Sequence, residues 1–310
     1  MKRLMILGAA VAAAAVGAGS ATAAGPSPFP APTVAQLFVA AQTVLPDGSM
    51  ANMFAPGSSV VFRAYAVDPS TKKVMTAKDV RYFYVTIPNQ PNVKLHYDAS
   101  APGASKGLPW TGQWTVPSTY PVGTVGFKIL VQAKTKTKSG QQRKGQFVQM
   151  PVSSAMLTIA AKPPAAYTPG ANAGAAGAGT GTGTLDLSLY VDTVNGTRPS
   201  GVAPRPVGCT QTNVYKRGEQ VVVRSWGTDL ATTALLTSDN VKEAHFSIAG
   251  QPDVTLNWGA HGTAPNQVFF WSNAWIVPAS FPLGETTIHV VFTLETGKTG
   301  SYDQVINVIP

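Results

Sequence analysis

Charge and cysteine are both scarce in this sequence of 310 residues. Asp, Glu, Lys and Arg make up 12% of the chain, and Cys209 is the only cysteine. A single cysteine excludes a disulfide within the chain, so apolar burial has to hold the fold together. Because free cysteines are often buried, we expect Cys209 to be a small core residue, with a disulfide between chains as the alternative.

Sequence patterns of known enzyme and metal sites are missing as well. The chain has no Cys-x-x-Cys, no His-x-x-x-His and no Gly-x-Ser-x-Gly. Its Gly-rich tract does not follow a strand and open a helix, as a phosphate-binding loop does. We therefore expect a protein without catalytic activity and without a cofactor.

One hydrophobic run stands out, at the N-terminus. Residues 4–16 are apolar, Lys2 and Arg3 precede them, and Ala21-Thr22-Ala23 follows. This is the pattern of a signal peptide, here residues 1–23, that is cleaved after export. The run is too short for a membrane span, which needs about 20 apolar residues. We expect a secreted or periplasmic protein without a transmembrane segment after cleavage.

The rest of the chain contains an internal repeat of one unit in two copies. Residues 57–131 align without a gap on residues 218–292, and 20 of the 75 pairs are identical. Such an ungapped match indicates duplication. Residues 161–184 between the copies are mostly Gly, Ala, Thr and Pro, which is typical of a flexible linker. This predicts a basic domain at 26–160 and a slightly acidic one at 185–310.

Within each copy apolar residues alternate with others. Phe83, Val85 and Ile87 do so in the first copy, and Ile288, Val290 and Phe292 in the second. A period of two marks strands with one face on a core. Pro and Gly interrupt these runs every 8–12 residues or so, the rhythm of an all-β sandwich or barrel. No helical pattern of useful length appears.

Both copies carry Trp-x-x-x-Trp-x-Val-Pro followed by an aromatic-Pro-x-Gly corner, from Trp110 in the first copy and Trp271 in the second. This pattern resembles bacterial immunoglobulin-like and fibronectin-III-like domains. The resemblance implies two homologous immunoglobulin-like β-sandwich domains. Such modules serve as adhesins, spacers, accessory domains and chaperones, so the resemblance leaves the function open.

Aromatic residues divide into two groups. Trp110, Trp114, Trp271 and Trp275 recur in both copies, which favours core packing over a sugar-binding platform. Tyr82 and Tyr84 are predicted to point outward, and the second copy has Glu243 and His245 instead. These two tyrosines are therefore candidate binding residues of the first copy.

Histidine and carboxylate residues suggest one candidate metal site. His245 and His289 are expected on neighbouring strands of the second copy with the same outward direction, and Glu243 could join them. Two solvated histidines on a sheet surface are the usual outcome of such a pattern.

Charge is the most informative polar feature. Residues 26–160 hold 13 Lys and Arg against 4 Asp and Glu, whereas residues 185–310 hold 7 against 10. The excess concentrates on one expected hairpin, in Lys128, Lys134, Lys136, Lys138, Arg143 and Lys144. Four of these lysines share strand parity and could form a ladder that meets an anionic partner. The alternative is a solvated edge that prevents aggregation.

We accordingly expect an exported, non-enzymatic protein that contacts an anionic surface, polymer or protein. Nucleic acid is a poor candidate, because export removes it and no set of stacking aromatics accompanies the lysines. Two alternatives stay open: a spacer subunit of a larger exported complex, and an enzyme or metal-binding protein that uses a His/carboxylate site in the second copy.

Overall fold

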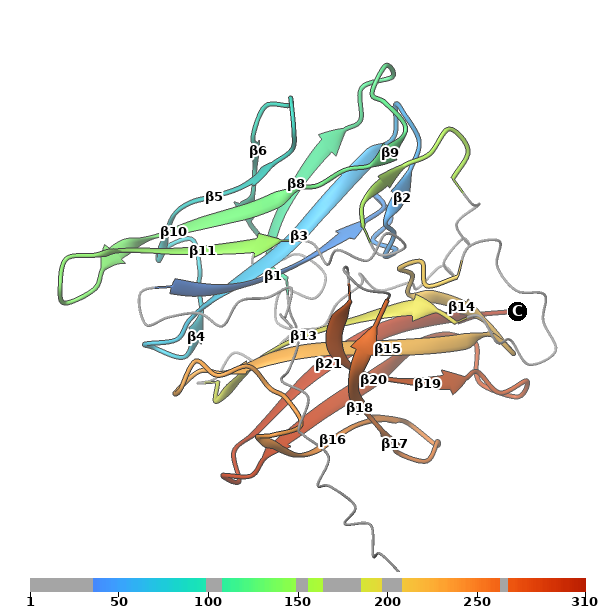
Figure 1. Cartoon of the computed structure of the whole chain (residues 1–310). Coiled ribbons are helices and arrows are strands. Elements are labelled where there is room, and N and C mark those ends of the chain that lie inside the picture. Colours follow the sequence, from blue (N-terminus) through green and yellow to red (C-terminus); the bar gives the residue numbers. More distant parts are fainter. Residues whose placement is uncertain (1–35, 99–107, 149–155, 164–184, 197–207, 263–266) are drawn as a thin grey trace, which may run out of the picture.

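The computed structural model describes residues 36–98, 108–148, 156–163, 185–196, 208–262 and 267–310 (Figure 1). The expected signal peptide and nearly all of the expected linker lie outside these ranges. Throughout the described ranges the regular structure is strand, with no helix, as the alternating sequence predicts. Accordingly, the described part of the chain offers no helix of the length and apolar character that a membrane span requires.

The first repeat forms one large curved sheet and one small sheet. The order in the large sheet is β6-β5-β10-β11-β1-β3-β8-β7, with β4 beside β3, and the small sheet is β2-β12-β9. The longer strands are β1 (Gln36–Val44), β3 (Ser59–Asp68), β5 (Val80–Thr86), β8 (Trp110–Thr115), β10 (Lys128–Lys136) and β11 (Gln142–Val148). The two-residue strands are β2 (Met53–Phe54), β4 (Lys73–Val74), β6 (Val93–Lys94), β7 (His96–Tyr97), β9 (Gly123–Thr124) and β12 (Thr158–Ile159).

The second repeat forms two sheets of its own, in the orders β13-β15-β19-β18 and β14-β21-β20-β16-β17. Ring packing between Trp271 and Phe292, 5.6 Å apart, joins the two sheets across the core. The strands are β13 (Leu187–Asn195), β14 (Val214–Lys216), β15 (Gln220–Asp229), β16 (Val241–Ile248), β17 (Val254–Thr255), β18 (Asn257–His261), β19 (Val268–Ile276), β20 (Gly284–Leu294) and β21 (Thr299–Ile309).

The two repeats share equivalent side-chain hydrogen bonds as well as equivalent residues. Trp110 Nε1 donates to the Met75 carbonyl at 3.0 Å, and Trp271 Nε1 donates to the Leu236 carbonyl at 2.9 Å. Trp114 and Trp275 each meet an aromatic residue edge to face, at 5.2 Å and 5.1 Å between ring centroids. All four tryptophans are buried, which confirms core packing.

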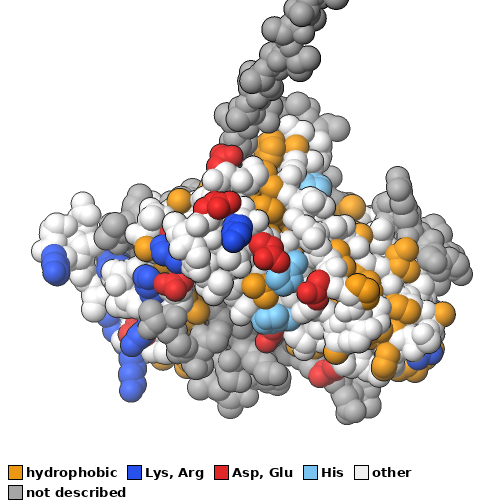
Figure 2. Space-filling view, turned by 90° about the horizontal axis from the view of Figure 1, so that it is seen from below, with side chains coloured by type: hydrophobic (Ala, Val, Ile, Leu, Met, Phe, Trp, Pro, Cys, Tyr) orange, Lys and Arg blue, Asp and Glu red, His pale blue; other side chains and the backbone are white. Residues whose placement is uncertain are grey.

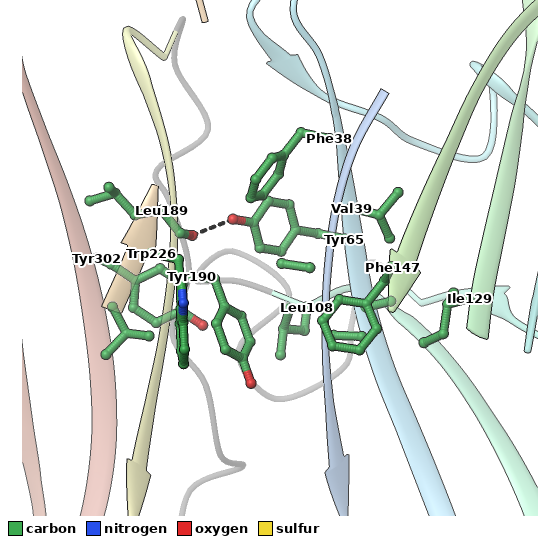
Figure 3. Packing of buried hydrophobic residues seen from close by; sticks show 14 of the residues in the cluster. Phe38, Val39, Tyr65, Leu108, Ile129, Phe147, Leu189, Tyr190, Trp226 and Tyr302 are labelled. Atoms are coloured by element: carbon green, nitrogen blue, oxygen red, sulfur yellow. Dashed lines mark hydrogen bonds between the residues drawn. The ribbon is translucent and has the colours of Figure 1, made fainter. Parts of the chain in front are cut away.

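The two repeats dock along β1 and β13 (Figure 1). Both strands are buried along almost their whole length, and one cluster of buried apolar residues runs through both repeats. Figure 3 shows the junction, where the Tyr65 hydroxyl donates to the Leu189 carbonyl. Phe147 of β11 contacts Tyr190 of β13, with ring centroids 6.3 Å apart. The repeats therefore share a packed interface in this structure.

Two asparagines give this junction its symmetry. Asn213 Oδ1 accepts the backbone N–H of Met50 at 2.8 Å, and Asn52 Oδ1 accepts that of Gln211 at 3.2 Å. Asn52 aligns with Asn213, and Met50 with Gln211, in the register of the duplication. Each repeat thus offers the other an equivalent contact, as in an interface with two-fold symmetry.

The symmetry is broken by one buried ion pair. Arg224 of β15 donates to the Asp192 carboxylate of β13 through Nε at 2.7 Å and Nη2 at 2.5 Å. Gln211 Nε2 adds a bond to the same carboxylate at 2.7 Å. At the strand position of Asp192 the first repeat has Gln42, whose side-chain amide instead donates across the junction to the Val191 carbonyl at 3.0 Å.

Candidate functional site

The candidate site lies on the outward face of β5, β10 and β11. Strand pairing places Tyr82 opposite Gln132 and Gln132 opposite Lys144 in one row. In the next row Tyr84 stands between Lys94 of β6 and Leu130 of β10. Residues in such rows are direct neighbours on one face. The face therefore combines aromatic and ammonium groups, while the amide of Gln132 between them is buried.

The two tyrosines are half-buried, with ring centroids 5.2 Å apart and planes inclined by 41°. They occupy alternate positions of β5, so both rings emerge on the same side of the sheet. Lys94, beside Tyr84, was not among the residues that we predicted from the sequence. The signal for it would have been its pairing with β5, which depends on a two-residue strand too short to recognise by pattern.

Lys128, Lys134, Lys136 and Lys138 are all exposed, as is Lys144. The β10–β11 hairpin that carries most of them projects beyond the rest of the sheet (Figure 1). However, the pairing register shifts after Gln132 against both neighbouring strands. This irregularity lies between Lys128 and the three lysines at the end of the hairpin, so the row of lysines is interrupted there.

Arg143 differs from the lysines, because its side chain is buried. Its guanidinium binds Asp68 through both terminal nitrogens and also donates to Ser70 Oγ at 2.7 Å. The second repeat has an equivalent pair, in which Lys298 Nζ lies 2.8 Å from Asp229 Oδ2. Recurrence of the pair in both repeats indicates a structural role, and it places Arg143 outside the exposed basic surface.

The same sheet face of the second repeat has different chemistry. Glu243, His245 and His289 replace Tyr82, Tyr84 and Lys128. Figure 2 shows histidine and acidic side chains gathered on the face of the molecule seen from below. His289 Nδ1 lies 2.5 Å from Asp303 Oδ1, and His245 Nδ1 lies 3.1 Å from Glu243 Oε1. Each histidine therefore has a carboxylate partner of its own.

The two histidine–carboxylate pairs include the three residues of the expected metal site. His245, His289 and Glu243 do lie on neighbouring strands, as expected. Within the described ranges, however, no three His, Cys, Asp or Glu side chains are grouped closely enough to hold a metal ion. The geometry offers two separate His/carboxylate pairs on an outward sheet face.

Cys209 is exposed, contrary to the expectation of a buried thiol. The reason is local: Cys209 adopts a positive φ of 58° in a turn, and its N–H donates to the Asn195 carbonyl at 2.8 Å. A residue in such a turn lies outside the alternating pattern that buries side chains on strands.

Comparisons with known proteins identify no family. Neither a family model nor a curated protein matches this chain. Among solved structures, dimeric latent PorU from Porphyromonas gingivalis aligns over 87% of this chain and 24% of its own, with 9% identity and a TM-score of 0.24. SGBP-B of the Bacteroides ovatus mixed-linkage glucan utilization locus, in complex with a mixed-linkage heptasaccharide, aligns over 83% of this chain and 43% of its own, with 10% identity and a TM-score of 0.17.

The C-terminal domain of the Streptococcus agalactiae AgI/II polypeptide BspA covers 87% of this chain and 99% of its own, with 8% identity and a TM-score of 0.18. The chain thus spans about a quarter of the length of the PorU structure and less than half of the SGBP-B structure. The TM-scores are too low to equate individual strands or residues with those of this chain.

Proposed function

We propose that this chain is an exported, non-enzymatic binding protein with two immunoglobulin-like sandwich domains, the first of which binds an anionic partner. The observation that carries this proposal is the contrast between equivalent sheet faces. Where the first repeat has Tyr82, Tyr84 and Lys128, the second has Glu243, His245 and His289. The fold accommodates both sets, so folding does not require the basic and aromatic one.

Electrostatics supports an anionic partner. The cluster at the end of the β10–β11 hairpin consists of Lys134, Lys136 and Lys138, all exposed. Exposed lysines contribute little to stability but raise the local concentration of negatively charged ligands and their association rate. Lys134 also donates to the Ala77 carbonyl at 3.0 Å, so Lys136 and Lys138 are the residues to change without disturbing that bond.

The experiment compares two variants that each lose two positive charges. The first is Lys136→Gln with Lys138→Gln, and the control is Lys73→Gln with Lys242→Gln, which removes exposed charges elsewhere. Binding to immobilised polyglutamate is measured at low and high salt. We expect the hairpin variant to bind roughly tenfold more weakly at low salt and with a weaker salt dependence, whereas the control stays close to the parent.

Equal loss in both variants would reduce the effect to net charge and contradict a hairpin site. Aggregation of the hairpin variant without loss of binding would assign the lysines to edge protection. If the parent itself fails to bind at low salt, the spacer role in a larger exported complex becomes the better account.

A further inference from the structure

A hollow of about 530 Å³ lies at the edge of the first repeat, between the second half of β8 and residues 90–94. Trp114 borders the hollow. The polar side chains around it belong to Gln90, Asn92, Lys94, His96 and Gln113. The hollow is shallow and open to solvent, so a ligand would lie along it and would not be enclosed.

The hollow follows from an unequal pairing of β8. On one side all six residues of β8 pair with β3, but on the other only Trp110 and Thr111 pair with β7. The chain crosses at Leu95 from β6, which pairs with β5, to β7, which pairs with β8. The rest of the β8 edge therefore faces residues 90–94 without a strand between them.

The chemistry of the lining points to a ligand rich in hydroxyl groups that also carries negative charge. The amides of Gln90, Asn92 and Gln113 each supply donors and an acceptor, and Lys94 supplies an ammonium. Gln113 Nε2 donates to Ser59 Oγ at 2.9 Å, which holds that side chain in place. None of the described residues around the hollow carries a carboxylate.

The second repeat keeps the amide of Gln90 as Gln251 but differs at the other polar positions of the lining. Asp253, Thr255 and Ala274 replace Asn92, Lys94 and Gln113. At the position of Gly112 stands Asn273, whose amide donates to the Thr255 carbonyl at 2.6 Å and bridges the corresponding gap. In the first repeat a Cβ on Gly112 would lie 2.7 Å from the Lys94 carbonyl oxygen, so no such bridge fits there. The lining of the first repeat is therefore not a requirement of the fold.

Lys94 links the hollow to the aromatic face, because it borders the hollow and stands beside Tyr84 on the sheet. A ligand leaving the hollow over Lys94 would reach Tyr84 and then Tyr82. Aromatic rings pack against the C–H faces of sugar rings, amides bind hydroxyls, and an ammonium pairs with a carboxylate. We propose that the hollow and the two tyrosines bind an acidic oligosaccharide, a short chain of sugars that bear carboxylates. This inference rests on the proposed function and names the chemical class of its anionic partner.

The test uses calorimetry of the full chain with three defined ligands: a galacturonic acid trimer, a neutral galactose trimer and a glutamic acid trimer. We expect the galacturonic acid trimer to bind at least about tenfold more tightly than either of the others, because it alone has both charge and sugar rings. The key variant, Asn92→Asp with Lys94→Thr and Gln113→Ala, copies the residues of the second repeat. It should lose roughly tenfold or more in affinity for that trimer.

Lys242→Gln, an exposed lysine of the second repeat, is the control and should bind the trimer within about twofold of the parent. If the triple variant lowers the melting temperature, Lys94→Gln alone is used, since that side chain is exposed. Equal affinity for the glutamic acid trimer would overturn the saccharide proposal while leaving a basic binding surface intact. Equal affinity for the neutral trimer, no binding of any saccharide, or full affinity in both hollow variants would also overturn it.

Discussion

Asn52 and Asn213 accept equivalent hydrogen bonds, because the side-chain oxygen of each accepts a backbone N–H from the other repeat. Both side chains are buried, with 1% and 2% of their surface exposed. Met50 and Gln211 are buried as well. The backbone N–H of Met50 would lose its partner if the Asn213 oxygen were removed, and that of Gln211 if the Asn52 oxygen were removed.

We predict that Asn52→Ala and Asn213→Ala each lower the free energy of unfolding by about 1–3 kcal/mol, the cost of a buried donor left unpaired. Denaturant unfolding followed by tryptophan fluorescence measures this. Gln141→Ala, at an exposed position, serves as the control and should change stability by less than about 0.5 kcal/mol. Parent-like stability of both asparagine variants would contradict a tightly packed junction.

The duplicated tryptophans should carry much of the core stability. Trp114→Ala and Trp275→Ala are each expected to cost about 3–5 kcal/mol, the usual cost of a large aromatic residue removed from a core. Trp258 is only half-buried, so Trp258→Ala should cost clearly less in the same unfolding measurement. A similar cost at all three positions would show that burial does not determine the effect.

Asp229 should make stability depend on pH. Burial alone would raise the pKa of this carboxyl, but hydrogen bonds from Lys298, Ala231 and Thr232 outweigh it and hold the pKa below the ordinary value of 3.8. Its contribution to stability is therefore complete above that value and is lost as the pH falls through the lower folded-state pKa.

The measurement compares Asp229→Asn with the parent by denaturant unfolding from about pH 6 down to about pH 2. The variant should be less stable than the parent at the upper end, and the difference should shrink as the pH falls. A difference that is constant over this range would show that Asp229 does not titrate below its ordinary pKa.

Cys209 is expected to react with Ellman's reagent in the folded protein, because its side chain is exposed. One thiol per chain should be titrated without denaturant, and Cys209→Ser should give no signal. A thiol that reacts only after unfolding would restore the buried interpretation.

The elements with strict alternation could be predicted from the sequence. The β5, β10 and β20 strands lie where Phe83, Ile129 and Val290 indicated, because a strand on a core has a period of two. The burial of Arg143 and the exposure of Cys209 could not be predicted. The first depends on a contact with Asp68 across 75 positions of sequence, and the second on a turn with positive φ.

The candidate site could be predicted from the sequence only in part, for a similar reason. Tyr82 and Tyr84 follow from strand parity, whereas Lys94 and Gln113 meet at one hollow through the crossing of the chain between two sheet edges. The sequence did contain one signal for these residues. When the two repeats are aligned, an amide or an ammonium group stands in the first copy and not in the second.

The reciprocal contacts at the junction have a consequence for how the two repeats can differ. In a dimer of identical chains every substitution appears twice, on both sides of the axis. Here the two halves belong to one chain, so a substitution appears once, and Asp192 could acquire a charge while Gln42 stayed neutral. Because both halves belong to one chain, each can change independently of the other, so the reciprocal contacts of Asn52 and Asn213 can persist while other positions and the outer surfaces of the two repeats differ.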